Sequence, residues 1–302
     1  MISRPHLGNR VTVRYRRPAG SIPPLTDAVG YLLAIDPVVQ VRTKTGAVVE
    51  IAPADVVALR VLTDTPVRTA QIRGLEHAAA FAWPGVERQW LDGWLLRAGH
   101  GVTFRANSAV PLDISAHADA IPAITAWYTQ RGLPPRLAIP DRLLPLPAGL
   151  PGEHANRVLA RGVSTREPDP SVVLAPRPDD AWLRFYHRDV PVDVLTAVID
   201  GELVFGALAG VAVGRAAVTD APDGTRWVGL SSVRVADEQQ DDPQGADPGR
   251  RLCEALLAWG ADRGATRGYV RVSDENTAAA QLFESLRFTL HHRSRYVSAP
   301  SR

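Results

Sequence analysis

A strand, a loop rich in small residues and a helix follow one another directly in the last third of the chain, and this order constrains the fold more than any other sequence feature. Alternating apolar residues predict a strand from Trp227 to Val235, and a helix is expected from Gly249 to Arg263. The first backbone amides of such a helix lack intrahelical partners and carry partial positive charge. The sequence therefore predicts an anion-binding site where this strand runs into this helix.

Further strands and helices alternate around this segment. The Asp223-Gly224 pair is typical of a hairpin turn into the strand that begins at Trp227. Residues 179–302 therefore predict an α/β or α+β layered domain. Its other expected elements are strands over Leu203–Val218 and Tyr269–Val272, a helix over Thr277–Leu286 and a closing strand from Phe288.

Short strands separated by tight turns fill the first part of the chain. Lys44-Thr45-Gly46 is typical of a hairpin turn, and Pro53-Ala54-Asp55 fits a single helical turn. The pattern predicts a small closed barrel over residues 1–67, similar to a Src-homology-3-like barrel. The segment is locally basic, which suits either an acidic or nucleic-acid partner or a solvated surface that docks on the rest of the chain, and we favour the solvated surface. The expected strands are Val11–Tyr15, Val29–Ile35, Val38–Thr43 and Ala47–Ile51.

Residues 69–176 predict a second segment of mixed strands and helices. The proline content rises from Pro134 to Pro151, which predicts irregular chain there. The expected elements are a helix over Ile72–Trp83, strands over Trp90–Arg97 and Val102–Val110, a helix over Ala120–Arg131 and a short strand over Leu137–Ile139.

An internal repeat relates the second and third segments. Thr125–Gly132 aligns without gaps to Leu257–Gly264, which lies 132 residues later. Both stretches place a tryptophan on the apolar side of a helix, an arginine in its last turn and a glycine at its end. Two interpretations remain open: convergence of two helix ends, or a tandem pair of one fold. In the second case the 69–176 half is degenerate and acts as a scaffold, because no glycine loop precedes its helix.

Three motifs in a fixed order give the chain a resemblance to a known superfamily. They are the strand Val233-Arg234-Val235, the loop and helix start from Gln244 to Gly249, and Asn276 followed by Leu282 and Phe283. In this order, and at the distances that separate them beyond Gly249, they resemble the GNAT superfamily of N-acetyltransferases, over roughly Leu195–Tyr296. A barrel followed by tandem halves also resembles an actinobacterial GNAT subgroup.

The resemblance implies an α+β fold, with a small β-barrel followed by tandem mixed sheets of the acyl-CoA N-acyltransferase type flanked by helices. It also implies that acetyl-CoA is the acetyl donor and that an amine is the acceptor. Val233 and Val235 would pair their backbones with the pantetheine arm, Asn276 would hydrogen-bond near it, and Phe283 would pack near the thioester. The pyrophosphate would lie on Gln244, Gly245, Ala246, Asp247, Pro248, Gly249 and Arg250.

Three features depart from the family pattern. Asp247 stands where the family has a glycine, and its carboxylate would repel a pyrophosphate unless it points away. The stretch from Val235 to Gly249 is longer than usual and acidic. Phe283 stands where many members have a tyrosine that protonates the leaving thiolate, and phenylalanine has no proton to give.

Acetyl transfer requires a neutral amine, a positioned carbonyl, stabilisation of the oxyanion and an acid for the thiolate. A strand amide freed near Val233–Val235 would stabilise the oxyanion. The catalytic residues that we favour are Ser232 and Tyr296, although nothing in the spacing singles out a base. The alternatives are Ser231 and Glu202 as bases, and His291 and His292 as acids, although both histidines also fit exposed strand positions.

Composition adds limits on location and partners. A formal net charge of +2 is too small to predict a nucleic-acid partner for the whole protein. The single cysteine, Cys253, excludes an internal disulfide, is typical of a reducing cytoplasm and fits a small core position. The most apolar run, Leu203–Val213, is about half the roughly 20 residues that a membrane-spanning helix needs. We therefore predict a cytoplasmic protein without membrane contact, as a monomer or a homodimer.

The sequence lacks the motifs of three other common enzyme classes. It contains no Gly-x-x-x-x-Gly-Lys phosphate loop, no His-Glu-x-x-His zinc pair and no Gly-x-Ser-x-Gly elbow, so no metal is predicted. Two functions remain. An N-acetyltransferase is favoured by the Val-x-Val strand, Gly249 and Asn276. A non-catalytic or weakly active GNAT-fold protein, which binds acetyl-CoA or acts on a partner, is favoured by Asp247 and Phe283.

Overall fold

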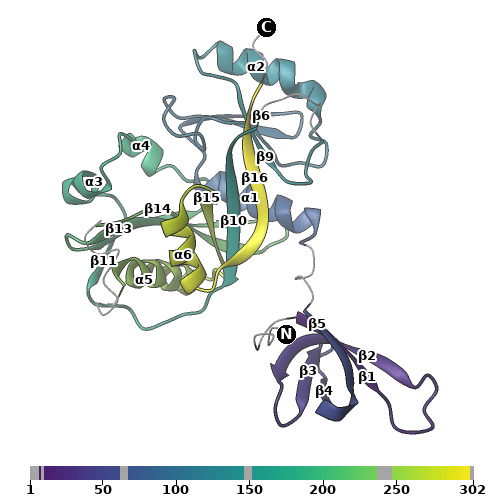
Figure 1. Cartoon of the computed structure of the whole chain (residues 1–302). Helices are drawn as coiled ribbons and strands as arrows, with labels where there is room; N and C mark the ends of the chain where they lie inside the picture. The colour runs from purple at the N-terminus through teal and green to yellow at the C-terminus, as the bar shows by residue number, and fades with distance from the viewer. Residues whose placement is uncertain (1–6, 8–9, 62–66, 146–151, 237–246, 300–302) are drawn as a thin grey trace. The chain divides into compact units, whose positions relative to one another are not determined.

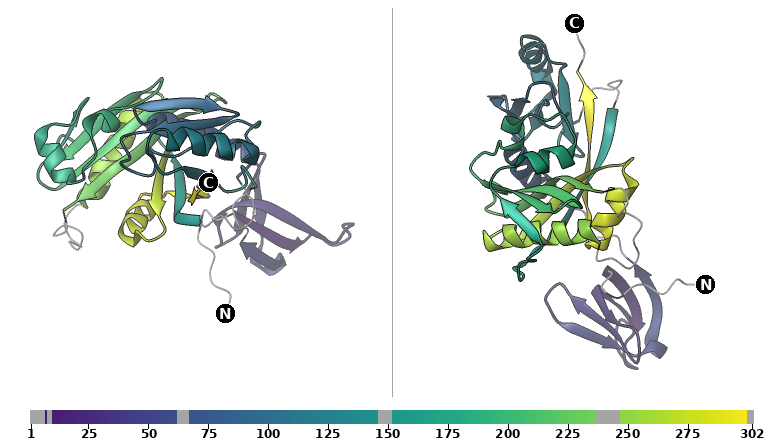
Figure 2. Two further views of the ribbon diagram at one scale, coloured as in Figure 1. Left: turned by 90° about the horizontal axis from the view of Figure 1, so that it is seen from above. Right: turned by 90° about the vertical axis from the view of Figure 1, so that its left-hand side faces the viewer.

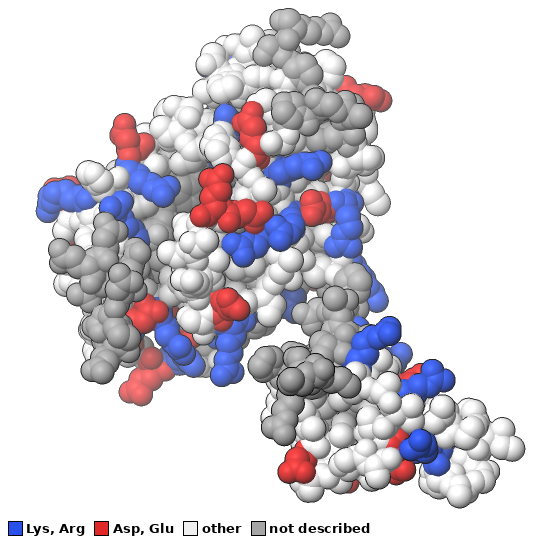
Figure 3. All heavy atoms as spheres, in the orientation of Figure 1, with Lys and Arg blue, Asp and Glu red and all other residues white. Residues whose placement is uncertain are grey.

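The structure is a computed structural model that describes residues 7, 10–61, 67–145, 152–236 and 247–299 (Figure 1). The chain divides into two compact units, Met1–Pro66 and Val67–Arg302. No helix in these residues combines the length and the apolar character that a membrane crossing requires. On the face of the larger unit seen in Figure 3, acidic and basic side chains are interspersed rather than gathered by sign.

The smaller unit is a five-stranded antiparallel sheet in the order β4-β3-β2-β1-β5. Val11 and Val13 on β1 pack with Leu32 and Val41 on one buried face. Among the described residues the sheet ends at β4 and β5, so the closed barrel predicted from the sequence is wrong in this detail. Strand β5, which pairs with β1, was not predicted from the sequence. The strands are β1 Arg10–Arg16, β2 Leu25–Ala34, β3 Val39–Thr43, β4 Val48–Ile51 and β5 Val56–Val61, with a 3-10 turn at Pro53–Asp55.

An eight-stranded mixed sheet forms the frame of the larger unit, in the order β11-β12-β13-β14-β15-β10-β16-β9. Neighbouring strands are antiparallel except β14 and β15, which run parallel because the helix α5 connects them. Strands β9 and β10 precede residue 176 and nevertheless flank β16, so the 69–176 and 179–302 stretches share this sheet. The strands are β9 Arg136–Pro140, β10 Gly152–Gly162, β11 Val172–Ala175, β12 Glu202–Leu208, β13 Ala212–Asp220, β14 Arg226–Val235, β15 Arg267–Ser273 and β16 Thr289–Ser298.

Helices cover both faces of this sheet (Figure 2). On one face Leu252 and Leu256 of α5 pack with Phe283 of α6 and with the sheet. The helix lies close because Gly214 carries no side chain: a Cβ there would meet Leu256 at 3.0 Å. Helices α1, α3 and α4 cover the other face. The helices are α1 Thr69–Ala82, α3 Asp180–Tyr186, α4 Val192–Leu195, α5 Pro248–Asp262 and α6 Thr277–Ser285.

A small three-stranded sheet, β6-β7-β8, completes the larger unit together with α2. The predicted strand Trp90–Arg97 is interrupted by a tight turn at Asp92-Gly93, both with positive φ. The predicted strand Val102–Val110 is wrong, because only Val110 lies in a strand and the preceding residues form turns. The elements are β6 Glu87–Leu91, β7 Trp94–Ala98, β8 Val110–Pro111, a 3-10 turn at Ala118–Ala120 and α2 Ile121–Thr129.

Candidate active site

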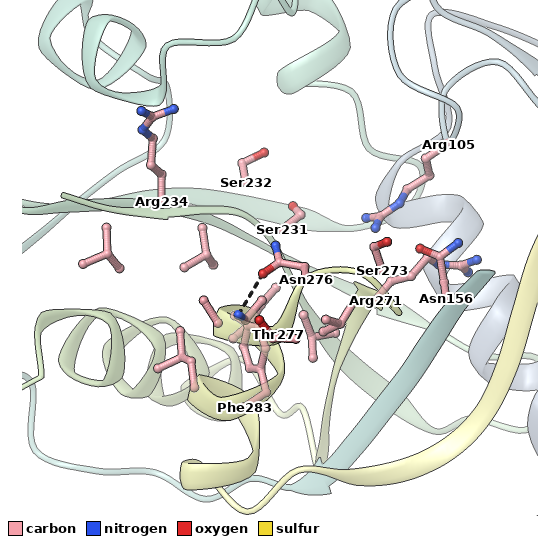
Figure 4. A pocket seen from close by; sticks show the side chains of 18 of the residues that line it. Arg105, Asn156, Ser231, Ser232, Arg234, Arg271, Ser273, Asn276, Thr277 and Phe283 are labelled. Atoms are coloured by element: carbon pink, nitrogen blue, oxygen red, sulfur yellow. Dashed lines mark hydrogen bonds between the residues drawn. The ribbon is translucent and has the colours of Figure 1, made fainter. Parts of the chain in front are cut away.

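The main cleft of the larger unit lies where β14 and β15 part. The two strands pair from Trp227 opposite Arg267 to Leu230 opposite Val270. Beyond that point β14 continues to Val235 and β15 to Ser273, but the ladder between them ends. A cleft of about 1070 Å³ opens there, bounded also by the first turn of α6 (Figure 4). Backbone groups on the facing edges of the two strands are thus available to an extended ligand.

A β-bulge shapes the edge of β14 inside the cleft. Ser231 lies opposite Arg215 and Arg234 opposite Val213, so β14 has one more residue than β13 in this stretch. The bulge includes Ser232, whose φ of 54° lies in the left-handed region. The Ser232 hydroxyl donates to the hydroxyl of Tyr186 over 3.2 Å, which joins β14 to the end of α3.

Most of the residues predicted from the sequence lie along this cleft, although they come from four different elements. Pro248 and Gly249 are buried in the first turn of α5, and Arg250 is exposed beside a neighbouring hollow. Gln244, Gly245 and Ala246 lie outside the described residues, as does the rest of the acidic loop. The predicted residues that line the cleft are Ser231, Ser232, Val233, Val235, Asp247, Asn276, Phe283 and Tyr296.

Asp247 has a defined role at the start of α5. Its carboxylate caps the helix by accepting a hydrogen bond from the backbone amide of Arg250 over 3.1 Å. One of the amides that an anion would use is therefore already bonded to a carboxylate. The carboxylate does not point away from the helix start, as a pyrophosphate there would require.

Asn276 and Phe283 hold α6 in place at the opposite wall. The Asn276 side chain caps α6 by accepting from the amide of Ala279 over 2.9 Å, and it also lines the cleft (Figure 4). Phe283 is buried and meets Phe288 edge to face at 5.4 Å between ring centroids. Both residues thus have structural roles in addition to any contact with a ligand.

The alternative catalytic residues lie elsewhere. Glu202 is exposed on β12 and pairs with Arg263 over 3.0 Å. His292 is buried rather than exposed, and His291 is half-buried beside it, so the exposed positions expected for both are wrong. Cys253 is buried in α5, and burial raises the pKa of its thiol, which suits a core residue.

Sequence reasoning missed the residues at one end of the cleft. Arg105, Asn156, Arg271 and Ser273 gather there, on the side away from Arg234 (Figure 4). They come from the loop before β8, from β10 and from β15. No local motif marks them, because the pairing of β10 with β15 brings together residues that are distant in the sequence.

The loop that carries Arg105 is held by Asn107, which is fully buried. The Asn107 side-chain oxygen accepts from the amides of Gly99 and Gly101, over 2.8 and 3.0 Å. Its side-chain nitrogen donates to the carbonyls of Val102 and Thr103, over 2.5 and 2.9 Å. These bonds replace backbone pairing, which explains why the stretch forms turns and not a strand.

A buried ionic cluster lies behind Arg271. The carboxylate of Glu76 accepts two bonds from Arg271, both over 2.8 Å, and a third from His292 over 2.8 Å. Burial by itself raises the pKa of Glu76, but Arg271 and His292 outweigh burial and hold that pKa well below 4.5. Burial lowers the pKa of Arg271, but Glu76 outweighs burial and holds that pKa above its usual range. Glu76 thus fixes Arg271 at the edge of the cleft.

The neighbouring His291 makes stability sensitive to mild acid. Burial, together with His292, lowers the pKa of His291 from 6.5 to about 4. Between these pH values the unfolded chain binds a proton that the folded chain does not, so stability falls as the pH drops from 6.5 towards 4. We expect H291Q to flatten this part of the profile, measured as the urea midpoint at several pH values. The exposed-histidine variant H117Q serves as control, and equal slopes in H291Q and the native chain would contradict the expectation.

No group of three or more His, Cys, Asp or Glu side chains in the described part of the chain is placed to hold a metal ion.

Comparison with known proteins gives two family matches. Residues 69–297 match the model described as "Probable histone acetyltransferase Rv0428c C-terminal". Residues 5–60 match the model described as "Rv0428c N-terminal Sm-like domain", so the smaller unit is Sm-like, a finer assignment than the Src-homology-3-like barrel predicted from the sequence.

Individual relatives agree with these matches. The chain is 69% identical over 301 residues to "Probable histone acetyltransferase Rv0428c" of Mycobacterium tuberculosis, covering 100% of this chain and 98% of the relative. It is 26% identical over 251 residues to "Uncharacterized N-acetyltransferase YobR" of Bacillus subtilis, covering 72% and 94%. The solved structure of a "GCN5-related N-acetyltransferase from Kribbella flavida" matches 77% of this chain with a TM-score of 0.51 and 16% identity, covering 96% of that chain, which shows the shared fold. The chain therefore belongs to the Rv0428c family of acetyltransferases, with an Sm-like domain followed by a GNAT fold.

Proposed function

We propose that this chain transfers the acetyl group of acetyl-CoA to an amine that enters the cleft between β14 and β15. The observation that carries the proposal is the parting of these two strands after Leu230 and Val270. An extended pantetheine arm can take the place of the missing strand neighbour, because it offers amide groups to the free edge of β14. Val233 and Val235 lie on that edge and Asn276 faces it.

The backbone supplies the oxyanion stabilisation that the reaction needs. In the transfer the neutral amine nitrogen attacks the thioester carbonyl carbon and the carbon–sulfur bond breaks, and the proton lost by the amine balances the proton taken up by the thiolate. Beyond Leu230 the amides on the β15 side of β14 have no strand partner in the described residues, and one of them beside the bulge at Ser232 is suited to receive the negative charge on the carbonyl oxygen. The amide needs no reorganisation, because β13 and β14 hold it in the sheet.

Two tyrosines are placed to protonate the thiolate, a task that Phe283 cannot perform. The Ser232 hydroxyl donates a hydrogen bond to the phenol oxygen of Tyr186. The phenol proton of Tyr186 is therefore not used in this bond and can be transferred to the thiolate. Tyr296 also lines the cleft and packs against Phe104, with the two rings tilted by 30° and their centroids 5.4 Å apart. We propose that Ser232 orients Tyr186 and that Tyr186 or Tyr296 is the acid. Comparing kcat in the matched variants Y186F and Y296F separates the two.

The proposal is tested by binding, exchange and turnover in the full chain. Calorimetry is expected to show binding of acetyl-CoA, and hydrogen exchange at residues 231–235 is expected to slow in the complex. Exchange in β12 should stay unchanged and serves as the internal control. Release of coenzyme A with a panel of amines then tests transfer. Binding without turnover favours the non-catalytic alternative, and absence of both binding and protection would overturn the proposal.

The capping carboxylate of Asp247 is expected to weaken the binding of acetyl-CoA. The variant D247N keeps a side chain that caps helices about equally well and removes one negative charge beside the proposed phosphate position. We expect the Kd of acetyl-CoA to fall by about threefold to tenfold at low salt and by less at high salt. The variant D223N, which removes a carboxylate from a turn outside the cleft, controls for net charge. An unchanged Kd in D247N would place the phosphates away from α5.

The relative from Mycobacterium tuberculosis is described as a probable histone acetyltransferase, so a lysine of a basic protein is one acceptor to test. The structure itself gives an independent criterion, which is the charge that lines the acceptor end of the cleft.

We infer that residues 69–176 are a degenerate copy of the half that binds acetyl-CoA. The connection β8-α2-β9 repeats the connection β14-α5-β15, since in each a strand, a helix and a second, parallel strand follow one another. In the first copy the parallel contact is reduced to one bridge between Ala109 and Leu137. Each helix is followed within three residues by a glycine with positive φ, Gly132 after α2 and Gly264 after α5.

Side chains at the two helix ends support the same inference. The Arg131 guanidinium lies 3.8 Å from the ring centroid of Trp127, and Arg263 lies 4.2 Å from that of Trp259. Each arginine also bonds to a glutamate that is the first residue of a strand, which convergence of two helix ends does not explain. These partners are Glu87 of β6 and Glu202 of β12.

A further inference from the structure

We propose that the acceptor is a small amine that also carries a carboxylate or phosphate group, and that Arg105 binds this acidic group. The inference rests on the proposed acetyl transfer and adds the chemical class of the acceptor. It follows from the charge of the cleft lining, from the presence or absence of an acidic partner for Arg271 and Arg105, and from the rigidity of the loop that carries Arg105.

The described lining of the cleft is strongly biased towards positive charge. It contains the arginines Arg105, Arg188, Arg234 and Arg271, whereas Asp247 is its single carboxylate. Asp247 stands at the start of α5, where the phosphates of acetyl-CoA are proposed to lie. The end of the cleft that holds Arg105 has no carboxylate among the described lining residues, and Asn156 and Ser273 supply uncharged polar groups there (Figure 4).

Arg105 differs from Arg271 in having no acidic partner. Both carboxylate oxygens of Glu76 bond to Arg271, which neutralises it. No carboxylate in the described part of the chain lies within ion-pair distance of Arg105. The Arg105 guanidinium instead makes a cation–π contact with Trp83, with its central carbon 5.7 Å from the ring centroid. A partly buried guanidinium without a counter-charge is stabilised by an anionic ligand. A carboxylate or a phosphate can accept two parallel hydrogen bonds from it.

The loop that carries Arg105 is ordered before any ligand arrives. The buried Asn107 bonds to backbone groups on both sides of the loop, and the Thr103 hydroxyl accepts from the amide of Ala106 over 3.2 Å. The backbone beneath Arg105 therefore loses little entropy when a ligand binds. This is a property of a built binding site rather than of an arginine on a solvated surface.

The same arrangement disfavours a basic peptide. A lysine-rich segment would bring several ammonium groups to an end of the cleft where Arg105 has no acidic partner among the described residues and the described lining has no carboxylate. Like charges at close range raise the free energy of the complex. An acceptor with one amine and one acidic group avoids this repulsion, because its acidic group faces Arg105 while its amine approaches the parted strands.

The first experiment compares matched acceptors on the full chain. Coenzyme A release is measured with ω-amino carboxylates of increasing length and with the amide of each, and with O-phosphoethanolamine against ethanolamine. A lysine-rich peptide forms a separate arm. We expect kcat/KM for at least one acid to exceed that of its neutral analogue by tenfold or more, and the two acid arms tell carboxylate from phosphate. Equal rates for acids and neutral analogues, or a preference for the peptide, would overturn the inference while leaving acetyl transfer intact.

The second experiment assigns the preference to Arg105. In R105Q the ratio of kcat/KM between acid and neutral analogue should fall towards one through a higher KM for the acid, and R105K should restore part of it. The variant R88Q removes an exposed arginine outside the cleft lining and should keep the native ratio. An unchanged ratio in R105Q would exclude Arg105 as the binding residue.

A binding measurement keeps this test separate from the test of acetyl transfer. The acids and their neutral analogues are titrated into the chain saturated with coenzyme A, and binding is followed by calorimetry. Tighter binding of the acids that is lost in R105Q supports the inference even if no turnover occurs with any amine. Equal binding of both sets in the native chain refutes it even if the chain proves to be an active acetyltransferase.

Discussion

Replacing Glu76 with glutamine is expected to destabilise the larger unit by about 3–5 kcal/mol. The substitution keeps the size of the side chain but removes the charge that faces Arg271 and His292 in a buried cluster. The Arg271 guanidinium would then be left buried without a counter-charge. The seven tryptophans all lie in the Val67–Arg302 unit, so tryptophan fluorescence during urea unfolding reports on that unit specifically.

A matched control tests whether the expected loss of stability arises because the Glu76–Arg271 pair is buried. Glu87 also bonds to an arginine, Arg131, but on the surface, and E87Q should shift the urea midpoint little. The double variant E76L/R271M replaces the buried pair with apolar side chains and should recover much of the stability lost in E76Q. A similar midpoint in E76Q, E87Q and the native chain would show that the cluster does not stabilise the fold.

The variant N107A is expected to lower stability by about 3 kcal/mol and to impair the acceptor end of the cleft. It leaves the buried amide of Gly99 and the partly buried amide of Gly101 without their side-chain acceptor, and a buried donor left unsatisfied costs about 1–3 kcal/mol. Amide hydrogen exchange at these two glycines should rise. Because the same loop carries Arg105, the KM of an acidic acceptor should also rise, while the Kd of acetyl-CoA stays close to native.

The surface turn at Asp113 provides the control for this loop. The Asp113 carboxylate accepts from the amide and the hydroxyl of Ser115, each over 2.8 Å, but the turn is exposed to water. D113A should therefore leave hydrogen exchange at Gly99 and Gly101 unchanged. Native exchange rates at these glycines in N107A would mean that the loop is ordered by other contacts.

The elements around the cleft could be predicted from the sequence because local signals agree there. Asp247 and Asn276 stand at helix starts, and apolar residues recur at helical spacing behind them, so α5 and α6 begin within one residue of the expected positions. The stretch Val102–Val110 was misjudged because its alternating apolar residues favour a strand, whereas the side chain of Asn107 captures the backbone groups that a strand would use. Strand β10 could not be predicted because its polar residues and the nearby prolines interrupt the alternation of apolar and polar side chains that indicates a strand.

The acceptor end of the cleft could not be predicted, because its residues meet only through the sheet. Glu76 and Arg271 are 195 residues apart, and Tyr186 reaches Ser232 across 46 residues. Neither pair belongs to a motif of fixed spacing. The donor side, in contrast, is built from one continuous strand-loop-helix segment, which is why sequence reasoning found candidates there and none at Arg105.

The position of β16 in the sheet has a consequence for how the larger unit is made. This strand lies between β10 and β9, and it pairs Tyr296 with Glu153 on one side and with Ala138 on the other. A ribosome therefore synthesises both neighbours well over a hundred residues before the strand that joins them. Until then the strand edges that will pair with β16 lack this partner, so the nascent chain is exposed to aggregation at this stage and completes its sheet late.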